Sequence, residues 1–392
     1  MYPQRFSALP AYAFPRLRAL LDHLPSGGEP IAMTIGEPQH AFPEFVPEVL
    51  AAHVSGFNKY PPNDGAPELL EAIASWVGRR FGAKVDAATE VLTLNGTREG
   101  LYNVNMALCP ESKNGQPPVV LIPNPFYQVY AVSTLSASAE PVYVNATAET
   151  GFLPDYASLP EDVLKRTAMC YICSPANPQG AVATESYWRE LIGLAERFDF
   201  KIIADECYSE VYRDAPPVGA LEVAHKMGAD PERVLIFHSL SKRSNLAGLR
   251  SGFVVSGPQN IARMKQLRNY AGTPLPLPLQ HVAVACWNDE THVAASRALY
   301  AEKFDLADEI FAGVEGYQSP EAGFFLWLPV EDAEQAAVKL WTQTGVRVLP
   351  GSYLSRDTDA GNPGQNYIRV ALVAPKQDVQ RGLIALRDCI YG

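Results

Sequence analysis

Charged residues are scarce in this chain, and positively charged residues are the scarcer kind. Only 19% of the 392 residues are charged, and 32 Lys and Arg stand against 43 Asp and Glu, which gives a formal net charge of −11. A nucleic acid or an anionic membrane surface needs clustered Lys and Arg to match its phosphates. The charge balance therefore argues against both as partners. A few arginines can still make a locally positive pocket for a small anion.

Long apolar runs are also missing. No stretch approaches the ~20 consecutive apolar residues of a membrane span. The first six residues, Met1 to Phe6, lack the basic segment followed by an apolar run that is typical of a secretory signal. From these two observations we expect a cytoplasmic protein.

Cysteine is sparse, with six residues in the whole chain. This number is too small for a disulfide framework. Cys170 and Cys173 have the spacing of a metal site, but residues 168–173 are predicted to form a strand, in which residues three apart point to opposite faces. No second pair completes a zinc site. We therefore predict no metal, and six reduced thiols that lie mostly in the core.

Apolar residues, by contrast, make up 47% of the chain, which suffices for a sizeable core. The length fits about two domains. From about residue 68 to residue 256, helical periods alternate with short apolar runs, and this pattern predicts a mostly parallel sheet with crossover helices. The predicted strands are 91–94, 119–122, 169–172, 201–204, 234–237 and 252–255, and the predicted helices include 67–81 and 185–198.

The C-terminal third has a different character. After a proline-rich run at 273–278, one long helix is predicted from about residue 280 to past residue 311. Beyond about residue 315, the segments 324–328, 346–349 and 367–372 are predicted strands, with helices near 332–343 and 376–390. We expect a large domain over residues 45–280, and a small α+β domain built from residues 1–44 and 281–392.

Lys242 is the most informative residue. It closes the run Ser239-Leu240-Ser241-Lys242, directly after the predicted strand 234–237. Open α/β sheets bind ligands at the carboxyl ends of their strands. A lysine there can form an imine with a carbonyl cofactor, while Ser239, Ser241 and Arg250 can hold a phosphate. Taken alone, the run is better explained as a surface lysine after a strand, because Ser-Lys pairs are common.

Four more predicted strands end in polar or aromatic groups. The glycine turn at 95–99 opens a helix whose free N–H groups suit a phosphate, and Phe126 and Tyr127 bring rings to the same edge. Asn177 lies in a proline-flanked turn, while Asp205 needs a partner or a helix cap. Each group has an ordinary structural explanation. Together with Lys242 they supply what pyridoxal phosphate needs: an amine for its aldehyde, a carboxylate for its ring nitrogen, and donors to its oxygen and phosphate.

At this point the chain resembles the fold type I, class I/II pyridoxal-phosphate aminotransferases of the aspartate aminotransferase superfamily. The resemblance covers nearly the whole chain, from Ile35-Gly36-Glu37-Pro38 through Tyr60-Pro61-Pro62 and Asn177-Pro178 to Asp205, Tyr208, the Lys242 run, Arg250 and Arg369. It implies an α/β fold whose large domain has a mostly parallel seven-stranded sheet flanked by helices, plus the small α+β domain. It also implies small-molecule substrates, namely an amino acid and a 2-oxo acid.

The resemblance also implies roles for individual residues. Lys242 would be the Schiff-base lysine and proton carrier, Asp205 would keep the cofactor's pyridine nitrogen protonated, and Tyr208 would donate to the ring oxygen. The implied cofactor-binding set is Gly96, Thr97, Arg98, Tyr127, Asn177, Asp205, Tyr208, Ser239, Ser241, Lys242 and Arg250, with Tyr60 contributed by the partner chain of a homodimer. Tyr127, rather than Phe126, would stack on the cofactor. Gly36, Asn177 and Arg369 would bind the substrate α-carboxylate.

The substrate is the most open question. Residues 12–21, 35–40, 93–100 and 205–212 are similar to proteobacterial succinyldiaminopimelate aminotransferases, which implies transamination of N-succinyl-LL-2,6-diaminopimelate with 2-oxoglutarate in lysine biosynthesis. The runs 61–65 and 274–278 depart from that pattern. An aspartate, alanine or aromatic aminotransferase, or a C–S lyase of the same fold, would keep every cofactor residue. A regulator that uses the fold to bind an effector would need a DNA-binding segment, for which the early start of the large-domain pattern leaves no room.

Overall fold

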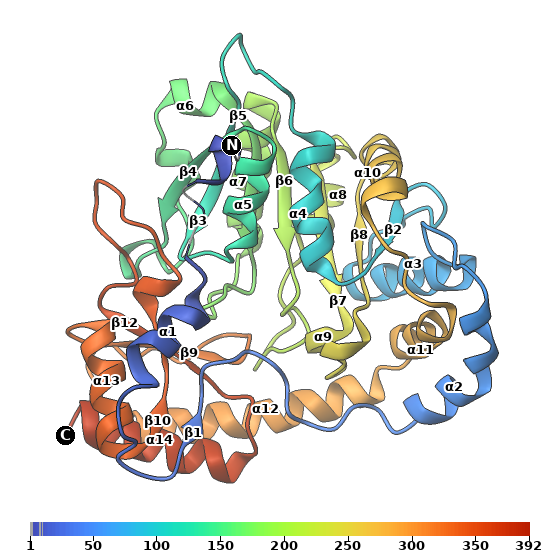
Figure 1. The fold of residues 1–392 in the computed structure, drawn as a ribbon. Coiled ribbons are helices and arrows are strands. Elements are labelled where there is room, and N and C mark those ends of the chain that lie inside the picture. The colour runs from blue at the N-terminus through green and yellow to red at the C-terminus, as the bar shows by residue number, and fades with distance from the viewer. Residues whose placement is uncertain (1–2, 8, 10) are drawn as a thin grey trace.

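A seven-stranded sheet lies at the centre of the molecule, whose computed structural model describes residues 3–7, 9 and 11–392 (Figure 1). The spatial order is β2-β8-β7-β6-β5-β3-β4, and β8 alone runs antiparallel to its neighbours. The predicted mostly parallel sheet is confirmed. The strands are β2 Val91–Leu94, β3 Val119–Asn124, β4 Glu140–Asn145, β5 Thr167–Cys173, β6 Lys201–Asp205, β7 Val234–Ser239 and β8 Gly252–Val255.

Helices cover both faces of this sheet because its central strands are apolar on both sides. Along β6, Ile202 and Ala204 pack into one core cluster while Ile203 packs into the other. The cluster on Ile203's side includes residues of α4 Thr97–Leu108, α5 Val129–Ser136 and α10 Pro258–Ala271. The opposite cluster includes residues of α3 Pro67–Phe81, α6 Glu161–Arg166, α7 Glu185–Phe198, α8 Ala220–Met227 and α11 Leu277–Asn288.

A second, smaller sheet is formed by C-terminal strands in the order β11-β12-β9, with a separate core cluster. Its strands are β9 Phe325–Pro329, β11 Leu349–Pro350 and β12 Tyr367–Ala371, and α13 Ala333–Thr344 and α14 Lys376–Ile390 pack beside it. The N-terminal α1 Ala13–Leu21 and β1 Ile31–Ala32 join this part, since β1 pairs with β10 Val346–Arg347. The chain then crosses to α2 Val46–His53 beside the large sheet, and α12 Thr291–Ile310 makes the return crossing (Figure 1).

The prediction of one long helix from about residue 280 is wrong, because two helices, α11 and α12, occupy this region. The Asp289 carboxylate accepts a hydrogen bond from the backbone N–H of His292 at 3.0 Å, which caps the start of α12. Arg243 donates to the carbonyls of Cys286 and Asp289 at 2.7 and 3.2 Å, which satisfies the end of α11. A side chain from a distant part of the sequence thus stabilises the break.

Two strand predictions also need correction. The predicted strand 346–349 is two short strands with different partners, because β10 pairs with β1 and β11 pairs with β12. Strand β4 was not predicted, and it lies at the edge of the large sheet, where it is only partly buried. The other predicted strands are present within a few residues of their predicted ends.

The cysteines and the surface complete the description. Cys170 packs in the large core while Cys173 lines a cavity, so the two lie on opposite faces as predicted. Cys170, Cys173 and Cys286 are buried and the other three are half-buried, so half rather than most lie in the core.

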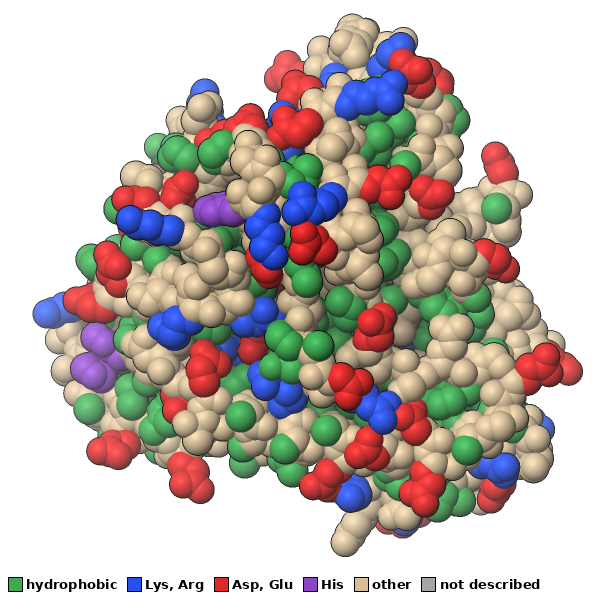
Figure 2. Space-filling model, turned by 180° about the vertical axis from the view of Figure 1, so that it is seen from behind, with side chains coloured by type: hydrophobic (Ala, Val, Ile, Leu, Met, Phe, Trp, Pro, Cys, Tyr) green, Lys and Arg blue, Asp and Glu red, His purple; other side chains and the backbone are tan. Residues whose placement is uncertain are grey.

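On the face seen in Figure 2, Lys and Arg side chains are interspersed with Asp and Glu. Within the part of the chain that the structure describes, no helix combines the length and apolar character that a membrane crossing requires. The cytoplasmic location stays a prediction.

Candidate active site

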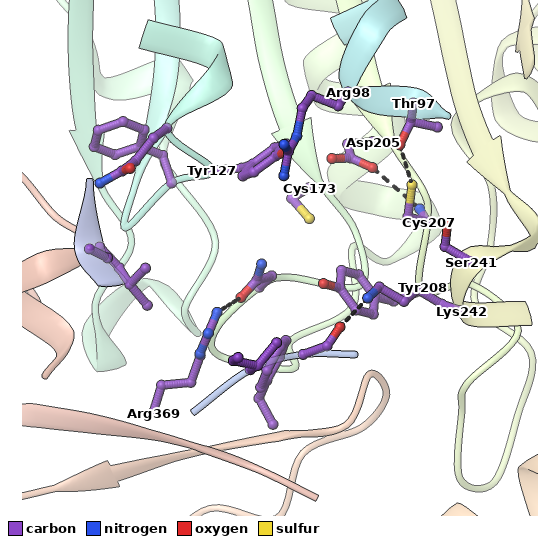
Figure 3. Close-up of a pocket in the computed structure, with 18 of the residues that line it drawn as sticks. Thr97, Arg98, Tyr127, Cys173, Asp205, Cys207, Tyr208, Ser241, Lys242 and Arg369 are labelled. Atoms are coloured by element: carbon purple, nitrogen blue, oxygen red, sulfur yellow. Dashed lines mark hydrogen bonds between the residues drawn. The ribbon is translucent and has the colours of Figure 1, made fainter. Parts of the chain in front are cut away.

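One cavity of about 280 Å³ opens at the carboxyl ends of the parallel strands, between the large sheet and the C-terminal part. The expected site residues that line it are Gly36, Thr97, Arg98, Tyr127, Asn177, Asp205, Tyr208, Ser239, Ser241, Lys242, Arg250 and Arg369. Figure 3 shows Asp205 and Lys242 on one side of the cavity and Arg369 on the other. The structure therefore brings together residues that lie up to 333 positions apart in the chain, from Gly36 to Arg369.

Lys242 extends from the short helix α9 Leu240–Arg243 into this cavity. Its ammonium donates a hydrogen bond to the backbone carbonyl of Gly36 and lies 5.2 Å from the centre of the Phe324 ring. Burial lowers the pKa of Lys242 to about 8. More of the amine is therefore neutral at physiological pH than in an ordinary lysine, which favours its reaction with a carbonyl carbon.

Asp205, at the end of β6, is buried and held on both carboxylate oxygens. The phenol of Tyr130 donates to Oδ2 at 2.6 Å, and the backbone N–H of Cys207 donates to Oδ1 at 3.4 Å. Burial raises the pKa of Asp205, and the hydrogen bonds from Cys207 and Tyr130 act in the opposite direction. A cationic partner in the cavity would complete the stabilisation of this carboxylate.

Tyr130 is a site residue that the sequence analysis missed. It lies on α5, its exposed fraction is 0%, and its ring stacks on that of Tyr171 at 4.3 Å between centroids. No sequence signal marked it, because a tyrosine in an apolar helix is usually a core residue. Only the fold reveals that its hydroxyl points at Asp205.

The expected phosphate donors gather around the starts of two helices. Thr97 is the first residue of α4, and Ser239 caps α9 by accepting a hydrogen bond from the Ser241 N–H at 3.3 Å. Gly96 does not line the cavity itself, but a Cβ at this glycine would lie only 2.2 Å from Nη2 of Arg250. Glycine thus lets the guanidinium approach the α4 terminus, where free N–H groups and a positive charge suit an anion.

Arg369, on β12, is buried against Asn177 and the N-terminal segment. Its Nη1 donates to the Asn177 side-chain oxygen at 3.1 Å, and its Nη2 donates to the carbonyl of Thr34 at 2.8 Å. Its Nε is buried without a hydrogen-bond partner among the described residues. Burial lowers the pKa of Arg369 to about 10, so the guanidinium remains charged at neutral pH. A charged arginine with an unused donor suits a carboxylate ligand.

The two candidate stacking rings differ in their surroundings. Phe126 is buried against Tyr143, with 5.1 Å between ring centroids, and belongs to a core cluster. Tyr127 is half-buried, and its hydroxyl accepts a hydrogen bond from Nε of Arg98 at 2.7 Å. These contacts favour Tyr127 as the ring presented to a ligand, and its stacking role stays a prediction.

Tyr60 lies away from the cavity, whereas the other expected site residues line it or, in the case of Gly96, lie beside the lining residue Arg250. The exposed fraction of Tyr60 is 101%, so its side chain makes almost no contact within its own chain. The prediction assigned Tyr60 to the site of a partner chain. Full exposure is compatible with that assignment.

The set of groups in the cavity fits pyridoxal phosphate. Lys242 offers an amine, Asp205 a carboxylate, Tyr208 a phenol and Asn177 an amide. Arg250 and the α4 terminus offer donors for a phosphate. The guanidinium of Arg369, which lines the same cavity, offers a positive charge for a further anion. These are the groups that this cofactor and an amino-acid carboxylate require.

Comparison with known proteins agrees with this fit. Residues 29–386 match the family described as Aminotransferase class I and II. An LL-diaminopimelate aminotransferase of Dehalococcoides mccartyi is 31% identical, over 98% of either chain. A crystal structure of an aminotransferase from Neisseria meningitidis has a TM-score of 0.93 at 38% identity, covering 98% of this chain and 99% of that one. The aminotransferase AspB of Helicobacter pylori has a TM-score of 0.91 at 32% identity, covering 98% and 100%. The chain therefore belongs to the class I and II aminotransferases, which depend on pyridoxal phosphate.

Proposed function

We propose that Lys242 and Asp205 carry the chemistry of amino-group transfer between an amino acid and 2-oxoglutarate. When bound, pyridoxal phosphate would supply a carbonyl group that reacts with amines and a ring that withdraws electrons from Cα. The observation that supports the proposal is the meeting of Lys242, Asp205 and Arg369 in one cavity. Within it, the Lys242 amine moves the proton at Cα, which suits a lysine whose pKa is about 8.

The remaining residues orient the reacting groups. Asp205 would hold a proton on the ring nitrogen of the cofactor, and Tyr208 and Asn177 would donate to its ring oxygen. Arg369 binds the α-carboxylate through its charge and its unused Nε donor. Because Arg369 also contacts Asn177, a carboxylate bound here is fixed relative to the cofactor's oxygen. These residues thus set the position of Cα relative to Lys242.

For the amino donor we propose N-succinyl-LL-2,6-diaminopimelate, which would place the enzyme in lysine biosynthesis. Several curated relatives at 28–31% identity are named LL-diaminopimelate aminotransferase, so the unacylated compound is the second candidate. The two donors share a carbon skeleton, but the succinyl compound has one carboxylate more and one free amine fewer. The charge of the site is therefore the property that discriminates between them.

The charges around the cavity favour the more anionic donor. Four cationic side chains line it, Arg98, Lys242, Arg250 and Arg369, against the single carboxylate of Asp205. The catalytic and binding roles proposed above use each of these five side chains except that of Arg98. The neighbouring acid, Glu99, is paired with Arg268 at 2.8 Å. Arg98 thus keeps charge available for a distal carboxylate of the donor, besides the cofactor contact expected from the sequence.

The space beyond Arg98 also suits a long donor. A second cavity of about 580 Å³ shares Tyr12, Arg98, Gln128 and Arg250 with the first. A donor longer than alanine would find additional room where the two cavities meet beside Arg98. A short donor such as alanine would leave it unused.

Steady-state kinetics test this assignment, with 2-oxoglutarate as acceptor and a panel of donors. We expect kcat/KM to be highest for the N-succinyl compound, above LL-diaminopimelate and well above aspartate, alanine and aromatic amino acids. Arg98→Gln should lower kcat/KM for the succinyl donor by roughly tenfold more than for alanine, as for one charge-assisted hydrogen bond, because a lost cofactor contact would affect both donors equally. A higher kcat/KM for any other member of the panel would overturn the substrate. Release of pyruvate and ammonia from cystathionine would indicate a lyase.

We further propose that the enzyme is a homodimer in which Tyr60 reaches the partner's cofactor. Tyr60 and Tyr270 have exposed fractions of 101% and 91% and flank a contact in which the Asn63 amide donates to Asn269 at 3.1 Å. Phe57, on the same segment as Tyr60, is 55% exposed. Exposed aromatic residues in such a group are typical of a protein interface.

A further inference from the structure

A lysine is fully buried near the active site, and no carboxylate among the residues that the structure describes pairs with it. Lys303, on α12, has an exposed fraction of 1%. Its ammonium donates to Nε2 of His40 at 2.8 Å and to the carbonyls of Leu372 and Ala374 at 2.9 and 2.6 Å. All three donors of the ammonium are therefore satisfied by neutral acceptors, none of which belongs to α12.

Both side chains are in the protonation states that this arrangement needs. Burial lowers the pKa of Lys303 to about 8, so the ammonium still predominates at neutral pH. Burial, followed by the positive charge of Lys303, lowers the pKa of His40 to about 4. The imidazole is therefore neutral at physiological pH, and its Nε2 accepts a hydrogen bond.

The acceptors belong to the two chain segments that form the carboxylate site. His40 lies four residues after Gly36, and Leu372 and Ala374 follow β12, which carries Arg369. The same two segments meet a second time, where the Ala371 N–H donates to the carbonyl of Met33 at 2.8 Å. Lys303 thus ties the Gly36 segment to the end of the Arg369 strand.

An aromatic contact path leads from His40 to the catalytic lysine. The His40 ring lies 4.6 Å from that of Tyr300, which stacks at 5.5 Å on Phe324. The Phe324 ring lies 5.2 Å from Nζ of Lys242 and 5.3 Å from the ring of Tyr208. A displacement of His40 is therefore transmitted by packed side chains to the groups that act on the substrate.

We propose that Lys303 is a positioning residue. Its buried ammonium fixes the Gly36–His40 segment against β12, so that Gly36 and Arg369 can both bind the substrate α-carboxylate. The proposal rests on the carboxylate role of Arg369 in the proposed function. Burying a charge lowers the stability of the folded protein, and an apolar residue at this position of α12 would fill the same space with a smaller loss of stability. Lys113 provides the comparison, because its ammonium also donates to three carbonyls, those of Thr167, Phe198 and Asp199, away from the cavity.

The test compares Lys303→Met with Lys113→Met in the holoenzyme. Each variant removes three hydrogen bonds, so a merely structural role would lower the stability of both and leave KM unchanged. We expect Lys303→Met to raise the donor KM by roughly tenfold, as for the loss of one hydrogen bond to a charged group, with a much smaller change in kcat. Lys113→Met should keep the wild-type KM. An unchanged KM in Lys303→Met, or equal increases in both variants, would overturn the proposal.

A milder pair of variants guards against a failure of Lys303→Met to fold. His40→Leu removes one acceptor and leaves the two carbonyls, whereas His40→Gln retains a side-chain oxygen. We expect His40→Leu to raise the donor KM and His40→Gln to restore much of the affinity. Hydrogen–deuterium exchange of the peptide spanning residues 34–41 gives a readout without turnover. It should accelerate in Lys303→Met and His40→Leu but not in Lys113→Met.

These readouts separate the inference from the proposed function. Unchanged exchange in both Lys303→Met and His40→Leu would overturn the positioning role. A wild-type protein that transaminates no donor of the panel would refute the proposed function. In that case the exchange measurement would still decide whether Lys303 fixes the segment.

Discussion

At the scale of single residues, Tyr130 shows how the fold adjusts the carboxylate of Asp205. In its proposed role, Asp205 must be ionised to hold a proton on a pyridine nitrogen, yet its burial raises its pKa. The hydroxyl of Tyr130, 2.6 Å from Oδ2, opposes this effect by hydrogen bonding to the charged form. Because Tyr130 is itself packed against Tyr171, the donor is held in place before any ligand binds.

We therefore expect Tyr130→Phe to weaken pyridoxal-phosphate binding. The lost hydrogen bond to a charged group is worth about 1.5–3 kcal/mol, or about 10–100-fold in affinity. Titration of the apo-protein with the cofactor, followed by fluorescence, measures this change. Tyr171→Phe is the matched control, since its hydroxyl donates to the carbonyl of Leu101 at 2.7 Å and does not contact Asp205. Equal losses in the two variants would attribute the effect to packing instead.

The position of a residue relative to the predicted strands explains which site residues could be predicted from the sequence. Asp205 and Lys242 follow predicted strands within five residues, so the rule for parallel sheets brings them to one edge without further information, whereas Arg250 precedes the predicted strand 252–255, which is antiparallel to its neighbours. Arg369 required the resemblance, because it lies within a strand of the second sheet and only tertiary packing brings it to Asn177. Tyr130 is a tyrosine in an apolar helix, and Lys303 is a lysine in a long helix. Neither position carries a local sequence signal of a functional role.

At the scale of elements, the junction between α11 and α12 shows why a helix boundary escaped sequence analysis. The residues around 288–291 contain neither glycine nor proline, so no strong helix breaker marks the boundary. The break depends on Arg243, whose exposed fraction is 3% and which contacts Cys286, Asp289 and the Glu290 carboxylate. Strand β4 escaped for a related reason, because its partial burial blurs the apolar pattern.

Arg243→Met should therefore destabilise the protein. The variant leaves two helix-terminal carbonyls without their donor, at a cost of about 1–3 kcal/mol each at most. We expect a clearly lower midpoint of urea denaturation, monitored by circular dichroism. Arg381→Met is the control, because Arg381 forms comparable bonds to Glu29 and Asp378 with a side chain that is 51% exposed, and exposed ion pairs contribute little. A midpoint shift no larger than that of the control would show that the junction does not depend on Arg243.

At the scale of the whole molecule, two sheets with separate cores are joined by α12 and by the N-terminal crossing segment. The division into a large domain, 45–280, and a small domain made of 1–44 and 281–392 stays a prediction, and Val282, Ala283, Cys286 and Trp287 of α11 pack into the core of the large sheet, so the two cores separate after α11 rather than at residue 280. The cavity lies between the two sheets, so residues of both are needed for one site. Tyr60 extends this reasoning beyond the single chain, because it lies on the surface and does not line the active-site cavity of its own protomer.

We predict that Tyr60→Ala and Lys242→Ala complement each other. Each homodimer should have little activity, because one lacks the partner's Tyr60 and the other lacks the reactive amine. Random exchange of subunits at equal amounts makes half of the molecules heterodimers, each with one complete site, so activity should recover to about a quarter of the wild-type value. Light scattering should give about twice the chain mass of 42.8 kDa. An active monomer, or a mixture no more active than its separate components, would show that Tyr60 acts within its own chain or not at all.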